Sequence, residues 1–296
     1  MKIIWNSGAA TDTGRLRERN EDRYWMDAER GVYLVVDGVG GHAAGELAAE
    51  TAVEAIRESV FDAEGPAEDR VRQAIARANN RIFELAQGDG ERRGMACVLT
   101  LAVVEDDQIT IGHVGDSRLY LVWDGAIRQL TSDHSPVGEE EARGELTERE
   151  AMAHPRRNQV FRDVGSRPRS AGEAEFIEIR ECRFRRDAAI LLCSDGLTDR
   201  LTAAQVRGVV ERFDGDPAKV AMDLVQMAND AGGQDNITAL FVAGPEFRGC
   251  GGATRPRFST TRLRVGGRMF RRRATLVAYG ILIGMMLWAV LRSTRG

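Results

Sequence analysis

This chain of 296 residues lacks the short patterns that mark several common classes of protein. Its four cysteines form no C-x-x-C pair, so cysteine zinc and redox motifs are not predicted, and we expect reduced thiols in a cytosolic compartment. There is no G-x-x-x-x-G-K-[ST] sequence, which argues against a nucleotide-binding P-loop. The first residues, MKIIWNSGAATDTG, contain too short an apolar stretch for a signal peptide, so we expect that the body of the chain is not exported.

Basic residues do not outnumber acids in the body of the chain. The formal net charge of the whole sequence is −4, but residues 247–296 contain eleven arginines and no acid, so the first 246 residues carry −15. Nucleic-acid binding needs clustered Lys and Arg, and an acidic body therefore argues against it. The same acidity favours a domain that gathers divalent cations.

Three acids stand in similar glycine-rich surroundings. Asp37 ends the apolar run of VYLVVDGVGGHAAGE, Asp195 ends that of ILLCSDGLTD, and Asp235 lies in the loop GGQDN. A single Asp-Gly pair is usually a simple turn, and we interpret Asp124-Gly125, between two short strands, in that way. The repetition of the pattern predicts instead that the three acids meet at one metal site.

Hydrophobic spacing predicts an α+β fold, with strands in the core and helices on the outer faces. The predicted helices cover 44–60 and 67–87, and two more follow the caps Thr202 and Asp216. The predicted strands cover 32–36, 97–104, 108–114, 119–123, 126–130, 176–179, 188–193 and 237–242.

Residues 131–169, which we call the flap, are charged and short of apolar runs. Thr147 and Glu150 form a capping-box pattern for one short helix that ends before Pro155. We expect this segment to lie over the end of the sheet rather than in the core.

The composition changes after residue 246. Residues 247–273 are rich in Gly and Arg and are predicted to be a linker, and 274–291 are uncharged and long enough, at about 27 Å, to cross a bilayer. A buried core helix is the alternative interpretation of 274–291. More arginines precede this run than follow it in the short tail 292–296, so the positive-inside rule predicts a cytoplasmic body 1–246 with a C-terminal anchor.

Carboxylates and backbone carbonyls without Cys or His are the ligands of Mg²⁺ or Mn²⁺, and the choice between the two ions stays open. Two such ions about 3.5–4 Å apart can hold a water molecule between them for in-line attack at phosphorus. Arg17 could then bind a phosphate with two N–H groups. This chemistry is hydrolysis without a covalent intermediate.

Five motifs in order extend this interpretation: RERNED at 17–22, DGVGGHAAGE at 37–46, GDSRLY at 115–120, SDGLTD at 194–199 and GGQDNIT at 232–238. Together they resemble the bacterial type 2C metal-dependent Ser/Thr protein phosphatases, the PPM family, over about residues 10–243. The resemblance implies a four-layer α-β-β-α sandwich of two packed antiparallel sheets with helices outside, and a flap at 131–169 that influences substrate access.

The resemblance also implies a set of metal ligands. Asp37 would bridge both metal ions, and the carbonyl oxygen of Gly38 would bind one of them. Asp195 and Asp235 match the other ligands of the two ions.

Further residues match supporting positions of the family. Glu21 and Asp22 match acids that hold metal-bound waters, and Arg17 matches the phosphate-binding arginine. Asp116 and Asp199 match, together with the metal ligand at 195, a weaker third metal site.

One position departs from the family pattern. Some members carry a histidine, proposed as the general acid, where this chain has Val39. We assign no catalytic role to His42, so protonation of the leaving group would fall to a metal-bound water.

The sequence therefore predicts a membrane-anchored phosphatase that hydrolyses phosphoserine and phosphothreonine in proteins and opposes a Ser/Thr kinase. Its expected partners are phosphorylated proteins and that kinase, and its expected location is the inner membrane, with a single span and the catalytic domain in the cytoplasm. Two alternatives stay open: a catalytically inactive, phosphatase-like scaffold, and a phosphatase for phosphotyrosine or a small phosphoester.

Overall fold

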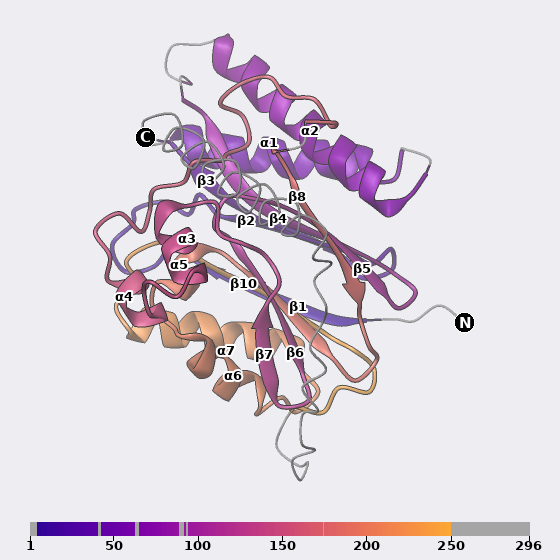
Figure 1. Cartoon of the computed structure of the whole chain (residues 1–296), viewed down its shortest axis with the longest axis vertical. Coiled ribbons are helices and arrows are strands. Elements are labelled where there is room, and N and C mark those ends of the chain that lie inside the picture. The colour runs from indigo at the N-terminus through magenta and orange to yellow at the C-terminus, as the bar shows by residue number, and fades with distance from the viewer. Residues whose placement is uncertain are drawn as a thin grey trace, which may run out of the picture. The chain divides into compact units, whose positions relative to one another are not determined.

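The computed structural model describes residues 5–249 except 41–42, 63–64, 89–91, 93 and 174, and these residues belong to a compact unit that spans 1–252. They form two five-stranded antiparallel sheets (Figure 1). The first sheet has the order β1 (Asn6–Asp12), β10 (Ile237–Ala243), β9 (Ala189–Cys193), β6 (Arg118–Trp123), β7 (Ala126–Gln129). The second has the order β2 (Arg23–Asp27), β3 (Val32–Val39), β4 (Ala96–Glu105), β5 (Gln108–Val114), β8 (Glu178–Arg183).

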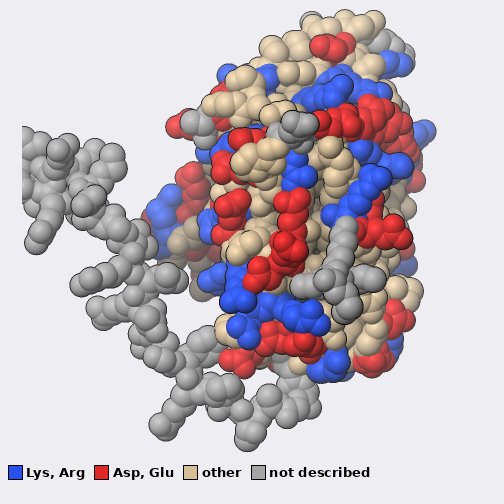
Figure 2. Space-filling model, turned by 90° about the vertical axis from the view of Figure 1, so that its right-hand side faces the viewer, with Lys and Arg blue, Asp and Glu red and all other residues tan. Residues whose placement is uncertain are grey.

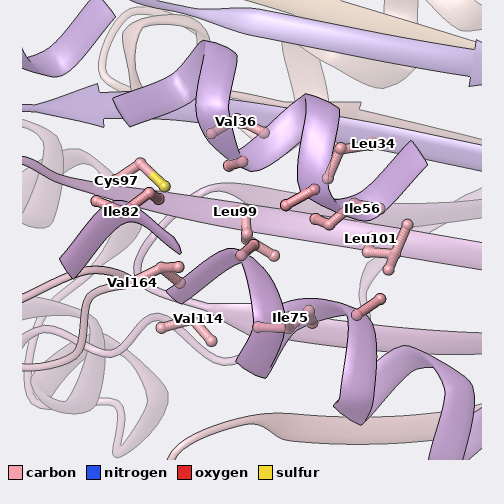
Figure 3. Close-up of a cluster of buried hydrophobic side chains, with 14 of the residues drawn as sticks. Leu34, Val36, Ile56, Ile75, Ile82, Cys97, Leu99, Leu101, Val114 and Val164 are labelled. Atoms are coloured by element: carbon pink, nitrogen blue, oxygen red, sulfur yellow. The ribbon is translucent and has the colours of Figure 1, made fainter. Parts of the chain in front are cut away.

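Strand β3 is apolar without interruption because both of its faces are covered. Side chains alternate between the two faces of a strand, so Leu34 and Val36 point one way and Tyr33 and Val35 the other. The first pair packs in a core with helical residues such as Ile56 (Figure 3), and the second pair lies in the core between the two sheets.

Helices cover the outer face of each sheet (Figure 1). Helices α1 (Ala43–Ser59) and α2 (Ala67–Gln87) pack side by side on the second sheet, and α6 (Ala203–Val210) and α7 (Pro217–Asp230) pack on the first. The caps predicted from the sequence are present, since Asp216 accepts from backbone N–H groups at the start of α7, and Thr202 forms a capping box at α6. The predicted α+β fold, two antiparallel sheets flanked by helices, is confirmed.

The flap, residues 131–169, contains two short helices, α3 (Pro136–Ala142) and α4 (Glu148–Met152). The capping box of Thr147 and Glu150 starts α4 as predicted. Helix α3 was not predicted, although Ser135 caps it and a proline occupies its first position. Its seven residues are too few for a clear hydrophobic period, so only the cap signals it.

Two strands of the structure lack a strong sequence signal. Strand β2 lies in a charge-rich stretch without a long apolar run, and β1 is built mainly from small residues. Both strands stand at sheet edges, where one side of the strand has no neighbouring strand and polar side chains are tolerated. The strand expected at 176–179 is β8, which begins and ends later, at Glu178 and Arg183.

Within the described part of the chain, no helix has both the length and the apolar character needed to cross a membrane. The predicted span 274–291, the tail 292–296 and the linker from residue 250 onward lie outside the described residues, as does His42. Phe247, where the predicted linker begins, is buried against Phe213 and Phe241.

Candidate functional site

Three predicted metal ligands meet at one end of the two sheets. Asp37 lies near the end of β3, Asp195 is the first residue of α5 (Asp195–Thr198) directly after β9, and Asp235 comes just before β10. Strands β9 and β10 are antiparallel neighbours, with Cys193 opposite Ala239, so the end of one lies beside the start of the other. Strand β3 of the second sheet contacts both of them. The sandwich thus brings together three acids that are up to 198 residues apart in the sequence.

A cavity of about 170 Å³ opens at this end of the sandwich. The flap contributes Asn158 and Val160 to its wall, and Val39, which is 39% exposed, contributes an apolar side chain without a titratable group. The predicted site residues that line it are Arg17, Glu21, Asp37, Gly38, Asp116, Asp195 and Asp235. Asp22 and Asp199 do not line this cavity.

Two glycines allow the close approach of Glu21 to the turn after β3. A Cβ atom on Gly38 would lie 2.3 Å from the carbonyl oxygen of Gly45, and a Cβ on Gly45 would lie 2.1 Å from Oε2 of Glu21. A larger residue at position 38 would push the backbone segments apart, and one at position 45 would displace the carboxylate of Glu21. The glycines at the end of β3 and at the start of α1 therefore leave room for this carboxylate beside the site.

The acids of this cavity repel one another. Burial, followed by the charges of Asp22, Asp195 and Asp116, raises the pKa of Asp37 well above its ordinary value. The pKa of Asp195 is raised in the same way by burial and by Asp116 and Asp199. Without a cation, such groups lower their energy by taking up protons, so the site is built for positive charge that the chain itself does not supply.

Asp22 has one oxygen atom that the fold leaves unsatisfied. Its side chain is 1% exposed, Oδ2 accepts a hydrogen bond of 2.7 Å from Ser194, and Oδ1 is buried without a hydrogen-bond partner. Burial raises the pKa of Asp22 to about 6. An orphaned buried oxygen is costly, and a metal-bound water next to the site would satisfy it.

The donor set of the cavity fits Mg²⁺ or Mn²⁺. Its described wall offers carboxylate oxygens, the amide groups of Asn158 and Asn236, and backbone carbonyls, but neither Cys nor His. Hard divalent cations bind oxygen ligands of this kind and retain several waters.

Arg17 lies at the mouth of the same cavity. Its side chain is 53% exposed, and Nη2 donates to Oδ2 of Asp235 over 2.8 Å. This hydrogen bond and the neighbouring acids raise the pKa of Arg17, so the guanidinium stays charged. An exposed, charged fork next to a group of acids can bind a phosphate once a cation occupies the carboxylates.

Asp116 and Asp199 share a second, smaller cavity of about 30 Å³ with Asp195. Because Asp116 and Asp195 line both cavities, the two spaces adjoin each other. Arg157 of the flap donates to Oδ2 of Asp199 over 2.5 Å. Burial, with Asp133 and Asp199 adding to it, raises the pKa of Asp116 to about 7.

Two supporting residues were not predicted. Ser194 orients Asp22, and Asn236 binds the segment that carries Glu21, since its Oδ1 accepts from the Glu21 amide and its Nδ2 donates to the carbonyl oxygens of Thr13 and Arg19. Both lie in motifs that the sequence had singled out, directly before or after a predicted ligand. Their roles depend on contacts more than 170 residues away, which spacing along the chain does not reveal.

His113, His134 and Glu178 form a cluster whose possible ligand atoms lie within 4.8 Å of one another. Its hydrogen bonds do not favour a metal ion. The backbone N–H of Gly115 donates to Nδ1 of His134, which leaves Nε2 as the ring atom that a metal would need. The guanidinium of Arg162 also lies 3.2 Å from that atom and would repel a cation.

Comparison with known proteins places the chain in a family. A family model described as protein phosphatase 2C matches residues 15–235. The serine/threonine phosphatase stp of Listeria monocytogenes is 35% identical over 243 residues, which cover 78% of this chain and 93% of that protein.

Solved structures give the same result. The Mycobacterium tuberculosis serine/threonine phosphatase PstP/Ppp has a TM-score of 0.72 at 29% identity and covers 81% of this chain and 99% of its own. A structure of the catalytic domain of PstP in complex with two manganese ions has a TM-score of 0.71 at 27% identity, with 81% of this chain and 98% of that chain covered. The family predicted from the five motifs is confirmed. The chain belongs to the protein phosphatase 2C family and is an enzyme of that family.

Proposed function

We propose that this chain hydrolyses phosphoserine and phosphothreonine in proteins, with a water molecule held between two divalent metal ions as the nucleophile. One observation carries the proposal: Asp37, at the end of β3, and Asp195, which follows β9 of the other sheet, line one cavity with further acids, and burial and the neighbouring acids raise the pKa of both. The names of relatives support the substrate class, because the Listeria protein is called a serine/threonine phosphatase. The two manganese ions of the PstP structure support the cofactor.

Four groups would hold the two ions, which are Mn²⁺ or Mg²⁺: the carboxylates of Asp37, Asp195 and Asp235 and the carbonyl oxygen of Gly38. When bound, the ions lower the pKa of a water molecule and neutralise the charge that develops on the phosphoryl group.

The surrounding residues would support this centre. Glu21 and Asp22 would accept hydrogen bonds from waters, and the unsatisfied oxygen of Asp22 favours that role. Asp116 and Asp199 would form the weaker third site, in the cavity where Arg157 now contacts Asp199.

The chain would bind the substrate through Arg17 and the flap. Arg17 is exposed and next to the carboxylates, so its fork can hold two phosphoryl oxygens. Asn158 and Val160 of the flap form part of the same wall and would contact a bound substrate. Val39 provides no proton donor, so the leaving group would take its proton from solvent at the site.

The test compares full-length protein, purified in mild detergent, with its Asp37→Asn variant. We expect Mn²⁺-dependent phosphate release from a phosphothreonine peptide by the natural chain and almost none by the variant, which is similar in shape. A folded natural chain without metal-dependent turnover would identify it as an inactive scaffold. A clear preference for a phosphotyrosine peptide or for p-nitrophenyl phosphate would overturn the substrate class.

We further propose the domain arrangement read from the sequence: a phosphatase domain at 1–246, a linker at 247–273, a membrane anchor at 274–291 and a short tail. The support is the uncharged run itself and the arginines that precede it. The enzyme would then act on the cytoplasmic side of the inner membrane against the products of a Ser/Thr kinase. Recovery of the full-length chain in the soluble fraction of a detergent-free lysate would contradict the anchor.

A further inference from the structure

His134, at the start of the flap, joins three segments of the chain. Its backbone N–H donates to the carbonyl oxygen of Gly115 over 2.7 Å, and its ring Nδ1 accepts from the backbone N–H of Gly115 over 3.0 Å. Its own carbonyl oxygen accepts from the backbone N–H of Phe161 over 2.9 Å. One buried residue therefore binds the turn between β5 and β6, the first residues of the flap and a segment near the end of the flap.

The turn that His134 holds has a demanding conformation. Gly115 has a φ of +109°, and a Cβ on this residue would lie 2.2 Å from the side chain of Val98. The next residue is Asp116, which is 8% exposed and lines both cavities of the site. Since both polar backbone groups of Gly115 bind His134, the direction of the Asp116 side chain depends on that contact.

The surroundings keep the ring of His134 neutral, so that one ring nitrogen can accept a hydrogen bond. Burial, aided by His113 and Arg162, lowers the pKa of His134 to about 3, so the ring stays neutral at physiological pH. The backbone N–H of Gly115 can only donate, so Nδ1 is its acceptor, whereas Nε2 lies 3.8 Å from Oε2 of Glu178 and 3.2 Å from Nη1 of Arg162. The rings of His113 and His134 pack with their centroids 4.9 Å apart.

We propose that His134 is a positioning residue for Asp116: it holds the Gly115–Asp116 turn through Nδ1 and links this turn to the flap. The proposal rests on the proposed function, in which Asp116 belongs to the weaker third metal site. Groups that orient metal ligands commonly change metal affinity by about 10- to 100-fold when they are removed. The weakest Mn²⁺ site should therefore respond to position 134, although His134 does not touch it.

Two amide variants separate the two ring nitrogens. In His134→Asn the side-chain oxygen can occupy the place of Nδ1 and still accept from Gly115, whereas in His134→Gln the oxygen lies one bond further out, near the place of Nε2. Both variants introduce a neutral amide. They differ in whether the Gly115 N–H keeps its acceptor.

Thr131→Val is the matched control for loss of a buried acceptor. The hydroxyl oxygen of Thr131 accepts from the backbone N–H of Leu119 over 3.1 Å, also at the start of the flap. This contact involves neither Gly115 nor Asp116. Its loss should lower the melting temperature without changing Mn²⁺ binding.

The experiment uses full-length protein and measures Mn²⁺ affinity by titration calorimetry, melting temperature in chelator, and kcat and KM on a phosphothreonine peptide. We expect His134→Gln to weaken the weakest Mn²⁺ site about tenfold or more, His134→Asn to stay within about threefold of the natural chain, and Thr131→Val to leave the affinity unchanged.

Equal Mn²⁺ affinities in the Asn and Gln variants would overturn the proposal, and so would a loss in Thr131→Val as large as that in His134→Gln. If the Gln variant does not fold while the Asn variant does, the role is structural and the proposal is overturned as well. Failure of the proposed function gives a different result, because the natural chain would then bind Mn²⁺ without hydrolysing the peptide.

Discussion

Asp133 in the flap and Asp37 in the 170 Å³ cavity are both enclosed by protein, but their charged neighbours differ. Asp133 accepts from Arg118, with Nη2 and Oδ2 2.7 Å apart, and Glu141 contacts the same guanidinium over 3.1 Å. Asp37 has no arginine among its contacts in the described structure and faces Asp22 and Asp195 instead. A buried acid with an internal cation is a structural element, and a buried acid among other acids is a site for an external cation.

On the outer surface, acids are paired with basic side chains, as Asp133 is paired with Arg118. On the face shown in Figure 2, basic and acidic side chains lie next to one another over most of the described residues. Exposed pairs of this kind, such as Arg143 with Glu139 and Glu145, contribute little because water screens them. The negative charge of residues 1–246 should therefore have its largest effect in the cavity, where the acids are buried together.

The largest effect is expected at Asp37. Asp37→Asn should reduce kcat about 1000-fold or more, because the lost charge would serve both metal ions. In chelator the same change should raise the melting temperature, since it removes repulsion among buried acids. A variant with unchanged activity in Mn²⁺ would show that Asp37 is not a ligand.

Asp133→Asn makes the same chemical change in the other region and should have the opposite effect on stability. It leaves the buried Arg118 with one carboxylate fewer, at a cost of roughly 3 kcal/mol. Denaturant unfolding in chelator measures this loss. A stability equal to that of the natural chain would mean that Arg118 does not depend on Asp133.

The pH dependence of the metal-free protein should reveal the repelling acids. The folded-state pKa values of Asp22 and Asp116 are raised to about 6 and about 7, above the ordinary 3.8, so the folded chain binds more protons than the unfolded chain between these limits. Their contribution to stability is therefore present at low pH and is lost as the pH rises through 6 and 7. In chelator we expect a melting temperature several degrees higher at pH 5 than at pH 8, and saturating Mn²⁺ should abolish this difference. A metal-free protein that becomes more stable from pH 5 to pH 8 would contradict the account.

Arg17→Lys tests the cation that the chain does place at the cavity. Lysine keeps the charge but loses the planar fork, so kcat/KM for a phosphothreonine peptide should fall about tenfold, mainly through KM. Arg19→Lys is a control, because Arg19 pairs with Glu46 and does not line the cavity. A similar loss of kcat/KM in both variants would show that Arg17 has no special role in binding the phosphate.

The smallest effect is expected at the exposed pairs. Arg143→Ala should leave both the melting temperature and kcat/KM unchanged within error, because Arg143 is exposed on the flap and its ion pairs are screened by water. A measurable loss of activity would show that this side chain contacts the substrate.

Local signals in the sequence predicted much of the fold. The helices at 67–87 and 217–230 carry strong hydrophobic periods and clear boundary residues, and Asp124-Gly125 forms the expected tight turn with positive φ at both residues. The edge strands β1 and β2 and the short helix α3 were not predicted, because partly exposed or very short elements do not need an apolar pattern.

The sequence predicted the acids that line the cavity, but not the residues that hold them in place. Asp37, Asp195 and Asp235 follow apolar runs or glycine-rich loops, which marks them in the sequence. Ser194 and His134 act through partners that only the folded chain brings close, and their short polar neighbourhoods resemble ordinary turns. The motifs therefore identified the acids, whereas the residues that orient them became visible only in the folded structure.

The most direct test of the central claim is to locate Mn²⁺ by anomalous diffraction in crystals of the natural chain and of Asp37→Asn. The account predicts two ions in the natural protein, in contact with Asp37, Asp195 and Asp235, and loss of at least one ion in the variant. Manganese bound elsewhere, or a cavity in which Arg17 remains the only cation beside these acids, would contradict it.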